Sequence, residues 1–180
     1  MLPGCTACGL LLVSDISNPT HLDPSDSFAR QHVAKSALED AYAAAQQRVR
    51  QLQHHPEGWG YASCTVECIE THISWLLLVG GHVYKFKKPL ALDFLDFSTP
   101  ALRLAACQEE VRINRRTAPH MYLDVVGVEG DGSDSWPWRV KPWAAVDAAG
   151  AEPAVLMRRF DQQALLSRRL EAGCVADEDM

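Results

Sequence analysis

The run from Ser63 to Lys88, SCTVECIETHISWLLLVGGHVYKFKK, constrains the fold more than any other part of the chain. It is rich in β-branched and aromatic residues, which favour strands. Gly80 and Gly81 interrupt it with the composition of a tight hairpin turn. The run therefore predicts two or three strands, joined by tight turns, of which the glycine pair forms the second.

Helical patterns lie on both sides of this run. Residues 23–55 carry apolar side chains three and four positions apart, which predicts one long amphipathic helix over 25–56. A second helix is expected in STPALRLAACQEEVRINRRTAP, with Thr99 as its N-cap, Pro100 at its first position and Pro119 closing it. The apolar stripe of the first helix comprises Ala34, Leu38, Ala41, Ala45, Val49 and Leu52.

The remaining elements complete an α+β pattern. MYLDVVGVEG and AVLMRRF read as strands, WRVKPW as a possible short strand, and DQQALLSRRLEAG as a short helix with Gly173 as its C-cap. We therefore expect an antiparallel sheet of about five strands with one crossing helix, preceded by the long N-terminal helix. The expected divisions are a flexible tail over 1–24, the helix over 25–56, the sheet domain over 63–160, and a last helix with the C-terminus over 161–180.

Composition narrows the classes of function. The chain has 180 residues, of which 47% are apolar, enough for one domain with a core. Its net charge of -6 argues against nucleic-acid binding through bulk charge, although local basic clusters could bind single phosphates. No stretch approaches the ~20 apolar residues of a membrane span. Six scattered cysteines are typical of a reducing compartment, so a cytoplasmic protein is expected.

The cysteines leave one alternative open. Cys5 and Cys8 have the spacing of half a zinc site, and Cys64 and Cys68 could complete it. Their irregular spacing and the strand-like context of the second pair favour free thiols instead. A cysteine-based metal-binding protein is therefore a secondary hypothesis.

The strand around Lys85 carries the first indication of a ligand. Side chains alternate along a strand, so its two aromatic residues share one face while Val83 and Lys85 share the other. This second face suits a nucleotide, with the base over the valine and a phosphate at the lysine. The alternative is a solvent face with ordinary lysines. Lys87 and Lys88 are expected at the strand end, facing water.

The following helix could supply a partner for Lys85. Glu109 and Glu110 lie midway along it, and a carboxylate projecting toward the preceding strand would fix the ammonium group. Glu109 is preferred, because Ile113 then falls one turn later as a core residue. The alternative is that both glutamates are solvated and pair with arginines of their own helix.

Several of these motifs occur together in order: ETHISW, VYKFKKP, LDFST, CQEEVRINRRTAP and MRRF. In this combination the chain resembles the amino-terminal lobe of the aminoglycoside phosphotransferase-like family. It is most similar to bacterial bifunctional proteins that join such a kinase-like domain to a carboxy-terminal P-loop ATP-binding domain. The resemblance extends from about Arg48 to Gly173.

The resemblance implies a protein-kinase-like fold that holds ATP between two lobes. Lys85 matches the strand-3 lysine that contacts the α- and β-phosphates, with Glu109 as its helix partner. The turn Glu70 to Ser74 takes the place of the glycine-rich phosphate loop but contains no glycine. The segment near Met157 matches the hinge that meets the adenine. The residues expected to bind the nucleotide are Val83, Lys85, Glu109, Thr71, Ser74, Met157 and Arg158.

The sequence also departs from the family. Phosphoryl transfer needs an acceptor-orienting aspartate and magnesium ligands, which the family carries in segments such as HGDLHxxN and DFE. Neither these nor a GxxxxGK[ST] motif occurs here. The expectation is an ATP-binding lobe of a kinase, truncated before its catalytic lobe and without catalytic residues or Mg²⁺ ligands. A free-standing regulatory module that binds a nucleotide weakly or docks onto another protein is the alternative.

Overall fold

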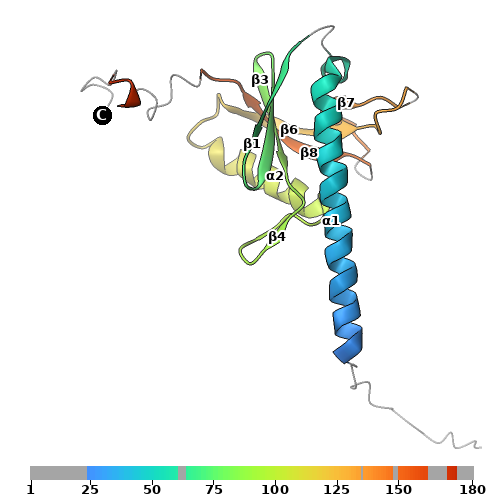
Figure 1. Cartoon of the computed structure of the whole chain (residues 1–180). Helices are drawn as coiled ribbons and strands as arrows, with labels where there is room; N and C mark the ends of the chain where they lie inside the picture. The colour runs from blue at the N-terminus through green and yellow to red at the C-terminus, as the bar shows by residue number, and fades with distance from the viewer. Residues whose placement is uncertain (1–23, 61–63, 135, 148–149, 162–169, 174–180) are drawn as a thin grey trace, which may run out of the picture. The chain divides into compact units, whose positions relative to one another are not determined.

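A computed structural model describes residues 24–60, 64–134, 136–147, 150–161 and 170–173 of the chain (Figure 1). The chain divides into two compact units, 1–34 and 35–180. The first contributes a described helical segment, residues 24–34, and the fold below is that of the second. The tail expected over 1–24 lies almost wholly outside the described residues. So does most of the expected 161–173 helix, although Gly173 has the positive φ of 65° expected of a C-cap.

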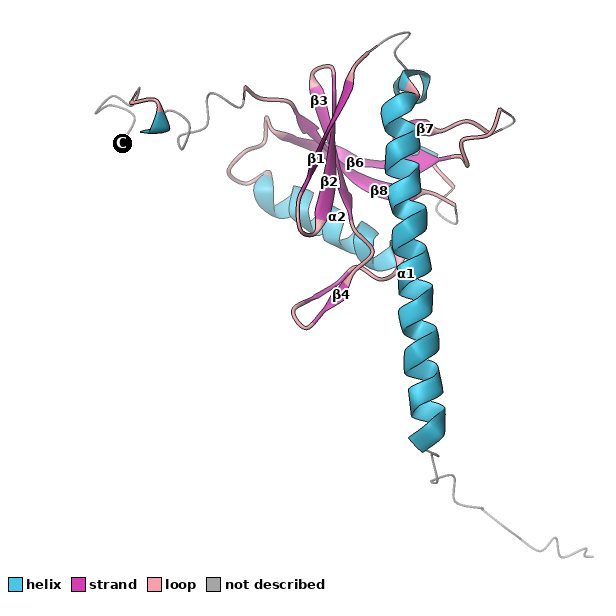
Figure 2. Cartoon of the chain, viewed as in Figure 1, coloured by secondary structure: helices cyan, strands magenta, loops and turns pink. Residues whose placement is uncertain are grey.

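The centre of the fold is a six-stranded sheet in which all neighbouring strands are antiparallel (Figure 2). The α+β class is thus confirmed. The spatial order is β1-β2-β3-β8-β6-β7. The bounds are β1 Val66–Glu70, β2 Ser74–Val79, β3 His82–Lys87, β6 Tyr122–Glu129, β7 Arg139–Pro142 and β8 Glu152–Arg158.

The sheet has one strand more than the expected five. The addition is β7, the WRVKPW segment, which pairs with β6 from Val126↔Pro142 to Glu129↔Arg139. Its four residues are too few to show a clear alternation in sequence, so the strand depends on pairing with β6. A separate two-stranded hairpin, β4 Ala91–Leu92 and β5 Leu95–Asp96, is not among the expected elements, whereas β7 was expected as a possible short strand.

The predicted glycine hairpin is confirmed. Val79 of β2 pairs with His82 of β3, which leaves Gly80 and Gly81 as the two-residue loop. Gly80 adopts a φ of 55°, a backbone conformation that a residue with a Cβ atom rarely takes. This turn sets the register that places Leu76 opposite Lys85.

One face of the sheet packs against α1, Pro24–His54, through the residues of this helix that follow Ala41. Ala45, Val49 and Leu52 of the predicted stripe are buried there. Their partners include Trp75, Tyr84 and Phe86, the core-facing aromatic residues of β2 and β3. The expected alternation along β3 is therefore confirmed, since both of its aromatic side chains face this core.

The opposite face is covered in part by α2, Pro100–Asn114. Its Cys107 and Val111 pack against Val125 and Val155. Thr99 is the N-cap as predicted: its hydroxyl accepts a hydrogen bond from the Leu102 backbone N–H at 3.3 Å. The helix packs mainly on β8 and β6.

Candidate functional site

The same side of the sheet that carries α2 has a groove with a volume of about 310 Å³. Its apolar wall comes from strands β1 to β3, with Leu76, Leu78 and Val83 among the side chains that line it. Lys85 also lines it, together with Met157 and Arg158 at the end of β8. The structure therefore brings four of the seven predicted nucleotide-binding residues, Val83, Lys85, Met157 and Arg158, to one groove.

The helix partner of Lys85 is Glu110. The Lys85 Nζ atom donates to Glu110 Oε1 at 2.8 Å. Glu109, the predicted partner, instead pairs with Arg112 of its own helix at 2.6 Å, with both side chains largely exposed. The predicted ion pair between the strand lysine and a helix glutamate is thus confirmed. The glutamate is Glu110, however, and not the predicted Glu109.

The rotation of α2 about its axis explains this error. The buried positions of the helix are Arg103, Cys107 and Val111, each four residues from the next. Ile113, the expected core residue, is 46% exposed. With Val111 on the sheet side, the adjacent Glu110 turns toward β3 and Glu109 turns toward solvent.

Lys87 is a second cation on the same carboxylate. Its Nζ atom donates to Glu110 Oε2 at 2.7 Å and lies 5.0 Å from the centre of the Phe97 ring. Its side chain is only 5% exposed. The expectation that Lys87 faces water was therefore wrong, because the carboxylate and the ring compensate its burial.

Lys88 was also expected in water and is buried as well. Its Nζ atom donates to Glu70 at 2.6 Å and lies 5.1 Å from the centre of a Trp75 ring. The hydrogen bond from Lys88 outweighs the small effect of burial and lowers the pKa of Glu70. This lysine thus ties the end of β3 to the end of β1.

The Glu110 carboxylate stays ionised despite its burial. Burial acts to raise its pKa, but hydrogen bonds and charge interactions with Lys85 and Lys87 outweigh this effect, and the pKa is lowered. One negative charge faces two positive ones, so the cluster carries an excess positive charge beside the groove. Burial and then the charge of Glu110 raise the pKa of Tyr122, a neighbouring groove residue.

Thr71 and Ser74 are engaged in the turn between β1 and β2. The Thr71 hydroxyl donates to the Ser74 carbonyl and accepts from the Ser74 backbone N–H, both at 3.0 Å. The Ser74 hydroxyl is fully buried and has no hydrogen-bond partner among the described residues. The Thr71 side chain and the Ser74 backbone thus stabilise the turn, and neither residue lines the groove, so the structure does not bring them to the other predicted residues.

A buried ion pair that the sequence did not reveal holds the first half of α2. Arg103 donates to both carboxylate oxygens of Glu152 on β8, at 2.5 and 2.8 Å. Arg48 of α1 donates to the same carboxylate at 3.1 Å. Arg103 and Glu110 lie two turns apart, so ion pairs to β8 and β3 fix both halves of the helix against the sheet.

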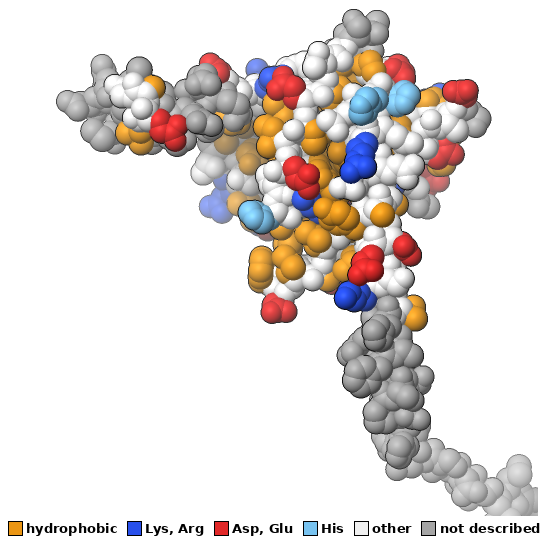
Figure 3. All heavy atoms as spheres, viewed as in Figure 1, with side chains coloured by type: hydrophobic (Ala, Val, Ile, Leu, Met, Phe, Trp, Pro, Cys, Tyr) orange, Lys and Arg blue, Asp and Glu red, His pale blue; other side chains and the backbone are white. Residues whose placement is uncertain are grey.

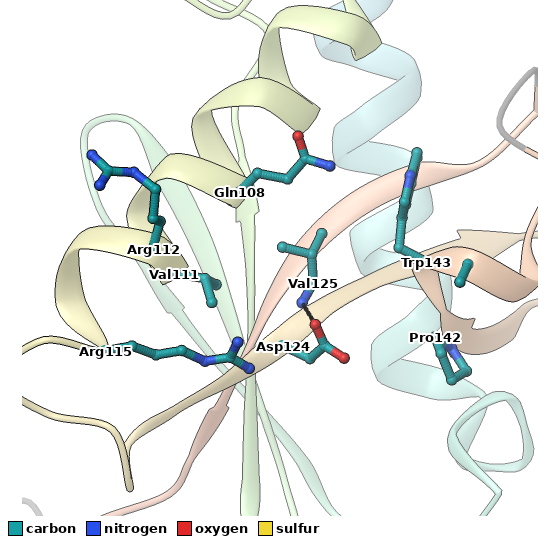
Figure 4. Close-up of a pocket in the computed structure, with 9 residues that line it drawn as sticks. Gln108, Val111, Arg112, Arg115, Asp124, Val125, Pro142 and Trp143 are labelled. Carbon is teal, nitrogen blue, oxygen red and sulfur yellow. Dashed lines mark hydrogen bonds between the residues drawn. The ribbon is translucent and has the colours of Figure 1, made fainter.

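A larger hollow of about 560 Å³ lies between α2, β6 and the Pro142–Ala144 segment (Figure 4). Val111 and Val125 form its apolar part, and Trp143 stands on the side away from the helix (Figure 4). Arg115 donates to the Tyr122 carbonyl, and Asp124 accepts from the Val125 N–H. Since much of its polar lining bonds within the protein, size alone does not make it the better site.

The described residues give no support to a metal centre. They contain no group of three or more histidine, cysteine, aspartate or glutamate side chains placed to hold an ion. Cys64, Cys68 and Cys107 are free thiols, and burial raises the pKa of Cys107 to about 12. Cys5 and Cys8 lie outside the described residues, so a zinc site that includes them remains a hypothesis.

Within the described residues, no helix is both long and apolar enough to cross a membrane.

Comparison with known proteins gives distant relatives. Uncharacterized proteins of Mycobacterium tuberculosis and Mycobacterium bovis are 32% identical over 110 residues, which is 60% of this chain. The match spans 19% of the length of these relatives. No family model matches the chain, and no solved structure matches it either.

Proposed function

We propose that this chain is a nucleotide-binding lobe of the aminoglycoside phosphotransferase-like kind, and that its groove binds ATP. The observation that carries this proposal is the Lys85–Glu110 pair beside an apolar groove. A lysine on the third strand paired with a glutamate on the following helix is how protein kinases hold the lysine that meets ATP phosphates. In that family, Mg²⁺ accompanies the nucleotide.

The lining of the groove supports the assignment of ligand class. Its volume of about 310 Å³ is at the lower end of the range for small-molecule sites. The apolar wall with Val83 and Met157 suits a flat base, and Lys85 provides a cation for phosphate oxygens. The excess positive charge of the lysine cluster favours a ligand with several negative charges.

The proposal is limited to binding. Positioning, metal and electrostatic effects supply nearly all the acceleration of phosphoryl transfer. The family carries the residues that provide them in motifs such as HGDLHxxN, and these motifs do not occur in this sequence. We therefore expect the 180-residue chain by itself to show no kinase or ATPase rate above that of a Lys85→Ala control.

Calorimetric titration with Mg-ATP tests the proposal. We expect saturable binding to the chain and a loss of at least about tenfold in affinity in Lys85→Ala, because an ion-assisted hydrogen bond to phosphate disappears. Lys141→Ala is the matched control: Lys141 also pairs with a glutamate, Glu129, at 2.6 Å, but on β7 and away from the groove. Absence of binding by the folded wild-type chain would refute the proposal.

A partner-binding module is the second candidate, and a separate observation favours it. Phe94 is 83% exposed between β4 and β5, and Leu92 beside it is 44% exposed. Figure 3 shows hydrophobic atoms gathered at the tip of this hairpin. Sedimentation of the purified chain measures its self-association, and the calorimetric titration measures its binding of Mg-ATP. Nucleotide binding without self-association favours the first candidate. Self-association without nucleotide binding favours the second.

A further inference from the structure

The Glu110 carboxylate is shared by two lysines that differ in their surroundings. Lys85, at 2.8 Å, has a side chain that is 26% exposed and lines the groove. Lys87, at 2.7 Å, is 5% exposed and is not part of the groove lining. One oxygen of the carboxylate serves each lysine, so the two ion pairs do not compete for the same atom.

The second lysine becomes important when Lys85 binds an anion other than Glu110, such as a phosphate. Glu110 is only 14% exposed, and leaving a buried carboxylate without a partner is costly. If Lys85 were its sole cation, every phosphate contact made by Lys85 would weaken the pairing of Glu110. With Lys87 bound to the other oxygen, the carboxylate remains compensated.

Few other groups near Lys87 could pair with its ammonium group in place of Glu110. Its described contacts are this carboxylate and the Phe97 ring, at 5.0 Å. The nearby Glu152 carboxylate is already engaged by Arg103 and Arg48. Cys107, which lies close enough for Lys87 to influence its pKa, is held neutral by burial. The ammonium group of Lys87 therefore stays with Glu110.

We propose that Lys87 is a positioning residue of the nucleotide site: it holds Glu110 from the inside so that Lys85 is free to bind the phosphates of a nucleoside di- or triphosphate. This inference rests on the proposed function, since it concerns the same groove. It assigns different tasks to two neighbouring lysines of one strand face. Lys85 contacts the ligand, and Lys87 acts through Glu110.

Affinities of Lys87→Met for Mg-ATP and for adenosine test this role. Without Lys87, the single charge of Lys85 must compensate both the buried Glu110 carboxylate and the phosphates, so we expect Mg-ATP affinity to fall by about tenfold or more. Adenosine, which lacks phosphate, should bind within about twofold of its wild-type affinity. An equal loss for both ligands would indicate a merely structural role and overturn the inference.

The double variant Lys87→Met/Glu110→Gln provides the decisive comparison. Removing the carboxylate charge releases Lys85, so we expect most of the lost Mg-ATP affinity to return. A double variant that binds as weakly as Lys87→Met would overturn the inference, as would a Lys87→Met variant with wild-type affinity. Failure of the wild-type chain to bind Mg-ATP would refute the proposed function itself. This outcome differs from failure of the inference on Lys87, in which the wild-type chain still binds Mg-ATP.

A measurement on the wild-type chain covers the case in which the variants do not fold. Nitrogen NMR of the lysine ammonium groups should show the Lys85 resonance shifting upon addition of Mg-ATP while that of Lys87 keeps its position. Comparable shifts of both resonances would overturn the division of tasks. Circular dichroism and thermal unfolding establish whether Lys87→Met, or Lys87→Gln in its place, is folded.

Discussion

Replacing Glu152 by glutamine should lower the free energy of unfolding by about 3–5 kcal/mol, the usual cost of breaking a buried ion pair by removing one partner. The substitution keeps the shape of the side chain but removes its charge. Arg103, which is 4% exposed, then remains buried without a counter-charge. Urea denaturation of the wild-type and Glu152→Gln chains measures the difference.

The geometry of the pair accounts for so large an effect. Arg103 reaches both oxygens of Glu152 and also donates to the Phe97 carbonyl at 2.9 Å. Arg48 adds a second cation to the same carboxylate. The pair therefore joins α2, β8, α1 and the segment after β5, and its loss weakens several contacts together.

Glu67→Gln is the matched control for this prediction. Glu67 pairs with Arg159 at 2.8 Å, and its side chain is 55% exposed. Exposed ion pairs contribute about 0–1 kcal/mol, so this variant should remain close to the wild type. Equal losses in the two variants would contradict the importance of the buried pair.

Glu110→Gln should lower the free energy of unfolding by about 2–4 kcal/mol, because it leaves Lys87 buried without an anionic partner. The adjacent Glu109→Gln should cost less than about 1 kcal/mol, since its pair with Arg112 is exposed. The two variants differ by one position in sequence. Similar losses in both would contradict the orientation of α2 described above.

The pH dependence of this difference has a defined sign. The pKa of Glu110 is lowered in the folded chain from its ordinary value of 4.5. A carboxylate with a lowered pKa stabilises the fold fully above its unfolded pKa, and the contribution is lost as the pH falls through the folded value. The stability gap between wild type and Glu110→Gln should therefore be constant near pH 7 and shrink below about pH 4.5. A gap that widens in acid would contradict this assignment.

Local patterns were sufficient to predict several parts of the fold. The glycine pair predicted the β2–β3 turn, Thr99 and Pro100 predicted the start of α2, and alternation placed Val83 and Lys85 on one face. Each of these features depends on residues within a few positions of one another. The additional strand β7 was less clear, because a strand of four residues acquires its definition from the neighbour with which it pairs.

Four of the residues that line the groove were predictable, two on β3 and two on β8. Val83 and Lys85 could be placed from alternation, and the resemblance to the kinase-like family placed Met157 and Arg158 near them. Thr71 and Ser74 were expected at the nucleotide because their turn occupies the position of a phosphate loop. Their hydrogen bonds instead close that turn, which is a local contact that the resemblance did not reveal.

The sequence by itself determined the β-hairpin, the two helices and the face on which Lys85 lies. Only the tertiary structure decided which glutamate meets Lys85, that Lys87 and Lys88 are buried, and that Arg103 pairs with Glu152, which lies 49 residues away. The physical reason is that each depends on how distant elements pack. One residue rotates a helical side chain by about 100°, so the packing of Cys107 and Val111 on the sheet selects Glu110 over Glu109. Burying a charged lysine is costly unless an anion compensates it, and for Lys87 and Lys88 that anion comes from another element.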